Sequence, residues 1–148
     1  MITGFIGAGN LARAIVIGLL DKRVLGSDEL LCASGTGATA QSLSQETGIG
    51  LASSRIDLIK RSQTIVLAFK PQHLDTITSE ESAVAQNNLV ISVLAGCTLE
   101  SLQAAFPHAR NIVRVMPNTP SRISKGVSAF CFQQPPSDED RQFVENLL

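Results

Sequence analysis

The sequence predicts an α/β protein of the Rossmann type, with a doubly wound, mostly parallel sheet and helices on both faces. Short apolar runs alternate with helix-like stretches along the chain, and a glycine-rich segment directly follows the first run. Alternating strands and helices form right-handed βαβ units, whose sheet is covered on both faces. A chain of 148 residues, 44% of them hydrophobic, is most simply one domain, so residues 1–148 are expected to form a single unit.

The first half of the chain is expected to supply four strands and three helices. Apolar runs predict strands at residues 2–6, 30–33, 50–52 and 64–69. Apolar residues at helical spacing predict helices at residues 10–20, 38–47 and 56–61. Gly48 is expected to end the second helix, because glycine is favoured just beyond a helix C-terminus.

In the second half, further strands are expected at residues 89–94, 111–116 and 126–132. Pro71 is expected to begin a helix, since proline is tolerated at the first helical position. Thr98 and Ser137 are expected to cap two more helices. The last helix carries an apolar stripe that runs to the end of the sequence without a C-cap, so we expect a truncated domain with this stripe exposed, at Phe143, Val144, Leu147 and Leu148.

The composition argues against several classes of function. Twelve Lys+Arg against 13 Asp+Glu leave no basic stripe for a nucleic acid, and the apolar runs are too short to span a membrane. Cys32, Cys97 and Cys131 show no metal-binding spacing, so no metal site is expected. Without a signal-peptide pattern, the protein is expected to be cytoplasmic. Cys32 and Cys131 fall in strands and are expected to be core residues, and Cys97 is expected to be a small packing residue.

The glycine-rich segment 7–12 is a GxGxxA motif between a strand and a helix. Gly7 permits the tight turn, Gly9 lets the backbone approach a diphosphate, and Ala12 lets the helix pack close to the sheet. The diphosphate then lies on the free N–H groups of the helix N-terminus. The alternative, a glycine-rich turn without a ligand, is disfavoured by the strand–turn–helix context.

The end of the second strand indicates which nucleotide is preferred. An NAD-binding site carries Asp or Glu about 20 residues beyond the loop, but residues 33–36 are Ala-Ser-Gly-Thr. Because Ser34 and Thr36 offer donors and no carboxylate repels a 2′-phosphate, NADP(H) is expected to be preferred, with NAD(H) as the alternative. Arg55 is a candidate for the adenosine end, and a solvated surface charge is the alternative.

Three later loops fall at the edge where open α/β sheets bind ligands. They are Ala68-Phe69-Lys70-Pro71, Ala95-Gly96-Cys97 and Met116-Pro117-Asn118-Thr119-Pro120. Lys70 offers an ammonium group to ribose or phosphate oxygens, and Gly96 allows close approach of the backbone. Asn118 both donates and accepts, from a loop that two prolines stiffen.

At these residues the chain resembles pyrroline-5-carboxylate reductase, most of all in residues 5–15, 68–71, 91–98 and 114–120. The resemblance implies NAD(P)H-dependent reduction of Δ1-pyrroline-5-carboxylate to proline, the last step of proline biosynthesis. It covers only the N-terminal half of that enzyme, which supplies the cofactor site. A C-terminal helical domain, absent from these 148 residues, is implied to form the homo-oligomer and much of the substrate pocket, so this chain alone is expected to be inactive.

The resemblance also assigns the cofactor-binding residues. Those implied at the pyrophosphate are Gly7, Ala8, Gly9, Asn10 and Leu11. Those implied at the adenosine ribose are Ser34 and Thr36. Those implied at the ribose and nicotinamide are Ala68, Phe69, Lys70, Pro71, Ala95, Gly96, Asn118 and Pro120. Two residues depart from the family pattern: Arg55 stands where the family usually has Asn, and Leu11 replaces the commoner Met.

No residue is assigned as the proton donor of the reaction. Lys70 is expected to bind the cofactor or support the structure, and His73 to lie on a surface helix; His108 has no assigned role. Arg110 and Arg114 are expected to be solvated or paired charges. Two alternatives to the reductase remain, namely another NAD(P)-dependent oxidoreductase, such as one of an F420 system, and a dinucleotide-binding protein without catalysis.

Overall fold

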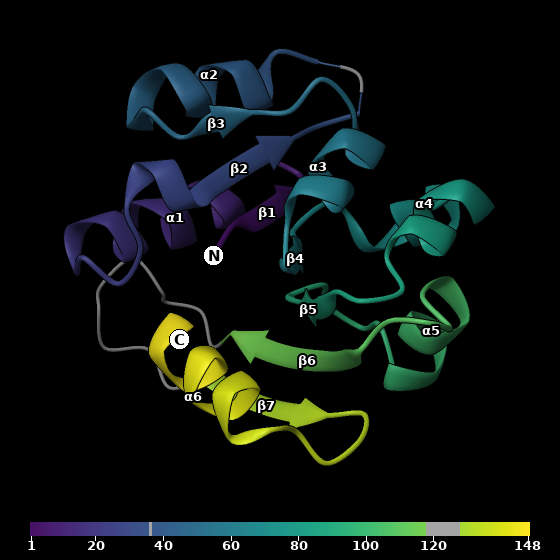
Figure 1. Cartoon of the computed structure of the whole chain (residues 1–148). Helices are drawn as coiled ribbons and strands as arrows, with labels where there is room; N and C mark the ends of the chain where they lie inside the picture. The colour runs from purple at the N-terminus through teal and green to yellow at the C-terminus, as the bar shows by residue number, and fades with distance from the viewer. Residues whose placement is uncertain (36, 118–127) are drawn as a thin grey trace.

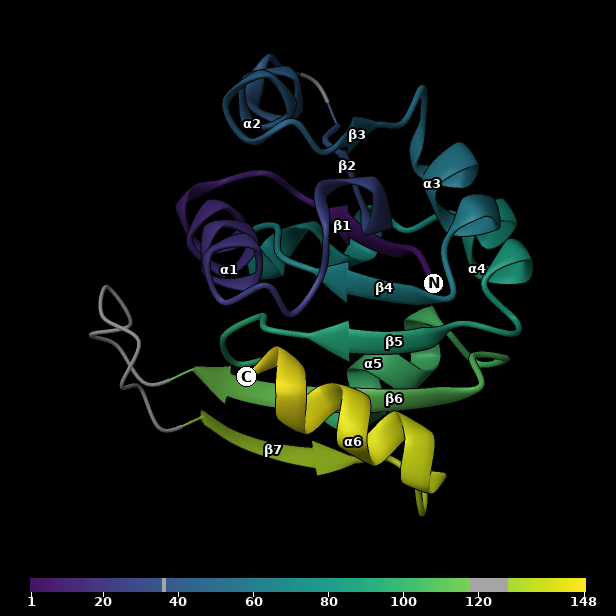
Figure 2. The ribbon, with the colours of Figure 1, turned by 60° about the vertical axis from the view of Figure 1, so that its left-hand side comes forward.

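The computed structural model describes residues 1–35, 37–117 and 128–148. These residues form a seven-stranded sheet with the order β3-β2-β1-β4-β5-β6-β7 (Figures 1 and 2). The strands are β1 (Thr3–Ile6), β2 (Leu30–Ala33), β3 (Gly50–Leu51), β4 (Thr64–Leu67), β5 (Leu89–Ser92), β6 (Asn111–Pro117) and β7 (Ser128–Phe132). All pairings from β3 to β6 are parallel, and β7 runs antiparallel to β6. The predicted fold class is therefore confirmed.

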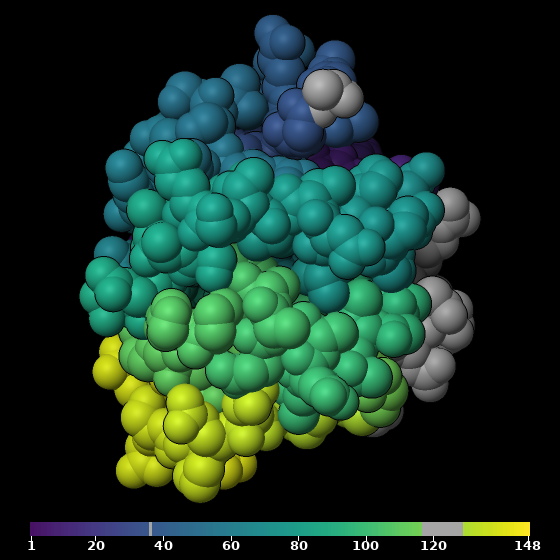
Figure 3. Space-filling model, turned by 90° about the vertical axis from the view of Figure 1, so that its right-hand side faces the viewer, coloured from purple at the N-terminus to yellow at the C-terminus, as the bar shows by residue number. Residues whose placement is uncertain are grey.

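Helices cover both faces of the sheet. One face carries α1 (Asn10–Asp21), α2 (Thr39–Thr47) and α6 (Asp138–Leu147). The other face carries α3 (Arg55–Arg61), the 3₁₀ helix η2 (Pro71–Thr76), α4 (Ser79–Val84) and α5 (Leu99–Ala105), and Figure 3 shows the teal and green segments that cover it. A short 3₁₀ turn, η1 (Ser27–Glu29), precedes β2.

The core consists of two apolar clusters, one on each face of the sheet. Successive strand residues alternate between them, as the two-residue period of a strand requires: Phe5 and Val66 belong to the cluster under α1, and Ile6 and Leu67 to the cluster under α3. Every residue of β1, β2, β4 and β5 is buried. This explains why these strands are continuous apolar runs in the sequence.

The helix ends follow the predicted capping residues. The Thr98 hydroxyl accepts a hydrogen bond from the Ser101 N–H at 3.1 Å, and the Ser137 hydroxyl accepts one from the Asp140 N–H at 3.1 Å. Gly48 closes α2 in the left-handed conformation, with φ of 76°. None of the helices in the described ranges combines the length and the apolar character that crossing a membrane needs.

The second half of the chain differs from the prediction in two elements. Pro71 begins a six-residue 3₁₀ helix rather than an α-helix. A separate helix, α4, then follows and was not predicted. Its start is a capping box, in which Thr78 accepts from the Glu81 N–H and the Glu81 carboxylate accepts from the Thr78 N–H. That signature was present in the sequence, but no long apolar periodicity followed it.

Two burial predictions were wrong. The apolar stripe of α6 is not an exposed face: Val144 and Leu147 are buried in the cluster under α1, and Phe143 and Leu148 pack against it. The antiparallel return of β7 lays α6 across the sheet (Figure 2), which covers the stripe within the chain itself. Cys131 is exposed rather than in the core, because β7 is an edge strand with a solvated face.

Candidate cofactor site

The parallel register brings the carboxyl ends of the strands to one edge of the sheet. Ile6, at the end of β1, pairs with Ala33 and Leu67, and Leu67 pairs with Ser92. The loops that leave β1, β2, β4 and β5 are therefore neighbours, as the sequence predicted. This edge is where an open α/β sheet binds its ligand.

The turn that leaves β1 is held tightly against its neighbours. The Gly7 N–H donates to the Ala33 carbonyl at 2.8 Å, and Gly7 has a φ of 102°. A Cβ placed on Gly7 would lie 2.5 Å from the carbonyl oxygen of Ala68 and 2.7 Å from the nitrogen of Phe69. Only glycine fits this position without moving the backbone of the loop after β4.

Two residues further on, the backbone of Gly9 is open. It is exposed and precedes α1 in an extended conformation, with no side-chain cap on the helix. A Cβ placed on Gly9 would have no other atom of the described residues within 4 Å. No side chain of the described residues caps the first-turn N–H groups of α1, which leaves them available to an anion. Around this turn Ala8 is buried, Asn10 is exposed and Leu11 packs partly on the core.

The loop after β2 contains the predicted adenosine-ribose residues. Ser34 is half-buried, and its hydroxyl donates to the Gly37 carbonyl at 3.3 Å. Thr36 lies outside the described residues. No carboxylate occurs between Ala33 and α2, so none there can repel a phosphate.

The loop after β4 lies beside the Gly7 turn. Ala68 is buried there, Phe69 is half-buried, Lys70 is exposed and Pro71 is the first residue of η2. The Lys70 ammonium is therefore accessible from solvent at the edge where the strands end.

The loop after β5 lies at the same edge. Ala95 and Gly96 are exposed, and Gly96 has a φ of 73°, a conformation that favours glycine. Asn118 and Pro120 lie outside the described residues. Cys97 is buried, which confirms a packing role for its thiol.

A hollow of about 300 Å³ opens between α1 and α2, next to the Gly7–Gly9 turn. It is lined by Ala8, Arg13, Ala38, Thr39, Ser42, Leu43 and Glu46. Arg13 and Glu46 form a two-bond ion pair across it, with Nε and Oε2 separated by 2.8 Å. This pair holds the pKa of the Glu46 carboxyl below its ordinary value. The pair could not be predicted from the sequence, because its members lie on different helices.

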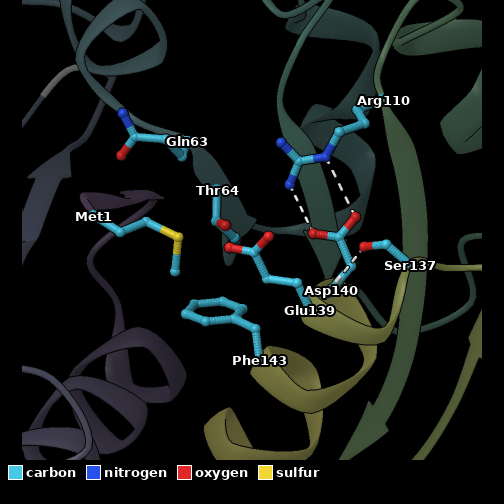
Figure 4. Close-up of a pocket in the computed structure, with 8 residues that line it drawn as sticks. All are labelled: Met1, Gln63, Thr64, Arg110, Ser137, Glu139, Asp140 and Phe143. Carbon is cyan, nitrogen blue, oxygen red and sulfur yellow. Dashed lines mark hydrogen bonds and ion pairs between the residues drawn. The ribbon is translucent and has the colours of Figure 1, made fainter.

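A second hollow, of about 240 Å³, lies near the amino ends of β4 and β6 (Figure 4). Two of its lining residues, Arg110 and Asp140, are joined by hydrogen bonds from Nη2 at 2.7 Å and Nε at 3.3 Å. This confirms a paired role for Arg110, which ties α6 to the sheet. Because the hollow is at the opposite edge from the Gly7 turn, it does not belong to the candidate cofactor site.

In the part of the chain that the structure describes, no residue is assigned as the proton donor. His73 and His108 are exposed, which agrees with the surface position expected for His73. The Cys32 thiol is buried and donates to the Ala40 carbonyl at 3.4 Å, and burial raises its pKa to about 11. Within the described ranges, no group of three or more His, Cys, Asp or Glu side chains is placed to hold a metal ion.

Arg55 is not a freely solvated charge. Its side chain is 16% exposed, and its guanidinium carbon lies 5.6 Å from the centre of the Phe69 ring. It therefore stands between the loops after β2 and β4.

The strand order, the glycine turn and the uncapped helix N-terminus define a dinucleotide-binding domain of the Rossmann type. Residues 2–96 match the family described as NADP oxidoreductase, coenzyme F420-dependent. The chain belongs to this family.

The curated relatives that match this chain carry the name of the enzyme that its motifs resemble. Pyrroline-5-carboxylate reductase of Pasteurella multocida is 36% identical over 97% of this chain and 54% of the relative. That of Haemophilus influenzae is 31% identical over 97% of this chain and 53% of the relative. The chain thus spans about half the length of the curated relatives it matches.

Solved structures share the fold. The 1-pyrroline-5-carboxylate reductase of Streptococcus pyogenes superposes with a TM-score of 0.82 at 26% identity, over 99% of this chain and 54% of that one. A pyrroline-5-carboxylate reductase of Coxiella burnetii gives a TM-score of 0.87 at 24% identity, over 98% and 54%. The Plasmodium falciparum pyrroline carboxylate reductase, solved with NADP bound, gives 0.81 at 22% identity, over 99% and 53%.

Proposed function

We propose that this chain binds NADP(H) and supplies the cofactor half of a pyrroline-5-carboxylate reductase, which forms proline from Δ1-pyrroline-5-carboxylate. The observation that supports this reaction is the match along 97% of the chain to a curated reductase at 36% identity. The observation that supports the cofactor is the open backbone at Gly9, where none of the atoms in the described ranges would lie within 4 Å of an added Cβ. A diphosphate fits that space and accepts from the N–H groups of α1.

The proposed cofactor path follows the edge of the sheet. We assign the pyrophosphate to Gly7, Ala8, Gly9, Asn10 and Leu11. The adenosine ribose is assigned to Ser34 and Thr36. The ribose and nicotinamide are assigned to Ala68, Phe69, Lys70, Pro71, Ala95, Gly96, Asn118 and Pro120. NADP bound in the Plasmodium falciparum structure and the lack of a carboxylate after β2 support NADP(H) over NAD(H).

The residues of this chain contribute binding and orientation. The cofactor supplies the hydride, and the protein supplies position and electrostatics. The α1 N–H groups hold the diphosphate, the exposed backbone at Ala95 and Gly96 admits a flat ring, and the Lys70 ammonium donates hydrogen bonds to phosphate or ribose oxygens. Such positioning lowers the barrier because the reacting carbon atoms must approach to about 3–3.5 Å.

The small-molecule substrate, a homo-oligomer and a cytoplasmic location also belong to the proposal. They rest on the resemblance and on the cysteine pattern. In the relatives, the stretch beyond the matched half makes up nearly half of the protein, and we assign the substrate carboxylate clamp to it.

The reaction can be tested with a fusion of residues 1–148 to the second half of the Pasteurella multocida relative. We expect oxidation of NADPH that depends on Δ1-pyrroline-5-carboxylate and yields proline, whereas residues 1–148 alone bind NADPH without turnover. A fusion that binds NADPH and reduces no Δ1-pyrroline-5-carboxylate contradicts the proposed reaction. Because the family description includes coenzyme F420, reduced F420 with NADP⁺ is the second substrate pair to assay, and turnover of that pair alone favours an F420-dependent enzyme.

A further inference from the structure

Arg55 is fixed at the edge of the sheet by two contacts. Its guanidinium stacks over Phe69 at 5.6 Å, a distance typical of a cation–π interaction. Its Nη1 donates to the Thr76 hydroxyl at 3.1 Å. These contacts come from the loop after β4 and from η2, so they hold the charge beside the strand ends rather than letting it swing into solvent.

One side of the guanidinium has no protein acceptor among the described residues. In Arg13 and Arg110, the edge formed by Nε and Nη2 takes a carboxylate, from Glu46 and Asp140 respectively. In Arg55, Nε is buried without a hydrogen-bond partner in the described part of the chain. A ligand cannot reach Nε while the protein covers it, so Nη2, which makes no hydrogen bond among the described residues, is the donor on this edge that an added acceptor can reach.

The same edge faces the loop after β2. A Cβ placed on Gly35 would lie 3.8 Å from Nη2 of Arg55. This is an ordinary van der Waals distance, so Gly35 lies directly beside Nη2, and Ser34 precedes it with a hydroxyl. In dinucleotide-binding folds, the loop after the second strand faces the 2′ position of the adenosine ribose, and a nearby Arg accommodates a 2′-phosphate.

We propose that Arg55 is the specificity-determining residue of this chain, and that its Nη2 donates to the 2′-phosphate of NADP(H). This inference rests on the proposed cofactor site. It places the selecting charge at the start of α3, about 20 residues after the loop that faces the ribose, rather than within that loop. A charged Nη2 donor suits a phosphate, because a hydrogen bond between two ionised groups is shorter and stronger than one between neutral groups.

Glu81 limits the strength of this selection. Its Oε1 lies 3.9 Å from Nη1 of Arg55, on the side away from the free edge, and its side chain is 8% exposed. Its other oxygen accepts the Thr78 N–H at 2.8 Å, so α4 holds the carboxylate in place. Part of the Arg55 charge is therefore already neutralised, and removing the Glu81 charge is expected to strengthen phosphate binding.

The test is calorimetric titration of the 148-residue chain with NADPH and NADH, and with 2′,5′-ADP and 5′-AMP as probes of the adenosine end. Arg55→Gln is expected to weaken NADPH and 2′,5′-ADP about 10- to 100-fold and to leave NADH and 5′-AMP within about twofold. Arg55→Lys is expected to recover part of the loss. Glu81→Gln keeps an acceptor for the Thr78 N–H and is expected to tighten NADPH several-fold.

The matched control is Arg61→Gln, which removes one positive charge at the other end of the same helix, where Arg61 is exposed and pairs with Asp57. It is expected to bind all four ligands as the native chain does. Equal loss of NADPH and NADH in Arg55→Gln overturns the inference, since it means that Arg55 only stacks on adenine or supports the fold. No change in any Arg55 or Glu81 variant overturns it as well. A native chain that binds neither dinucleotide overturns the proposed function itself.

Discussion

Gly7→Ala tests the contact between the β1–α1 turn and the loop after β4. The added Cβ would lie 2.5 Å from the carbonyl oxygen of Ala68 and 2.7 Å from the nitrogen of Phe69. Both atoms are backbone, so no side-chain rotation relieves the overlap. The substitution also places a Cβ on a residue with φ of 102°, where L-residues are strained.

The expected loss of unfolding free energy is the sum of these two effects. Strain at positive φ costs about 1–2 kcal/mol, and forcing extra volume into a packed region costs about 1–3 kcal/mol. We therefore expect Gly7→Ala to lower the free energy of unfolding by about 3 kcal/mol, and to weaken NADPH binding because the two loops must separate.

Urea denaturation followed by far-ultraviolet circular dichroism measures this loss. Gly48→Ala is the matched control, because Gly48 also has a positive φ, of 76°, but no atom of the described residues within 4 Å of an added Cβ. It is expected to cost only the strain, about 1–2 kcal/mol. A loss in Gly7→Ala no larger than that in Gly48→Ala would refute the close packing of the two loops.

Three further predictions concern the rest of the fold. Arg110→Leu leaves the largely buried Asp140 carboxylate without the two hydrogen bonds from Arg110. It is expected to lower the free energy of unfolding by about 1–3 kcal/mol in urea denaturation. An unchanged urea midpoint counts against the role of this ion pair in attaching α6 to the sheet. Val144→Ala, at a fully buried position, is expected to cost about 1–3 kcal/mol, whereas an exposed stripe on α6 predicts almost no loss. Iodoacetamide at pH 8 is expected to alkylate the exposed Cys131 in the folded chain and to spare Cys32, which is buried with a pKa of about 11. Mass spectrometry of the peptides measures which thiol is alkylated, and early labelling of Cys32 contradicts its burial.

The fold could be predicted because its local signals agree with one another. Strands such as Thr64–Leu67 are buried on both faces, so their apolar runs are unbroken and easy to recognise. Thr98 and Ser137 carry the capping hydroxyl in the residue itself. The burial of α6 could not be predicted, because it depends on the antiparallel return of β7 and on a long-range partner, the core under α1.

Part of the candidate site could be predicted because its signals, too, are local in the sequence. Gly7 and Gly9 have roles that depend on the adjoining strand and helix, which the sequence shows directly. Arg55 was ambiguous, because the groups that hold it, Thr76 and Glu81, lie more than 20 positions away and on elements that were predicted poorly. The position of Arg55 beside Phe69 needed the three-dimensional structure.

The central proposal is that main-chain N–H groups after β1 bind a diphosphate. Titration of the native chain and of Gly9→Asp with NADPH tests this binding most directly. Gly9 has φ of −77° and ψ of −169°, a conformation in which Asp caps a helix well, so the variant is expected to unfold at the same urea concentration or slightly above it. Its carboxylate would occupy the N–H groups and repel the diphosphate. We predict that the native chain binds NADPH and that Gly9→Asp weakens binding by about 100-fold or more. Equal affinity of the native chain and a folded Gly9→Asp variant would contradict the account.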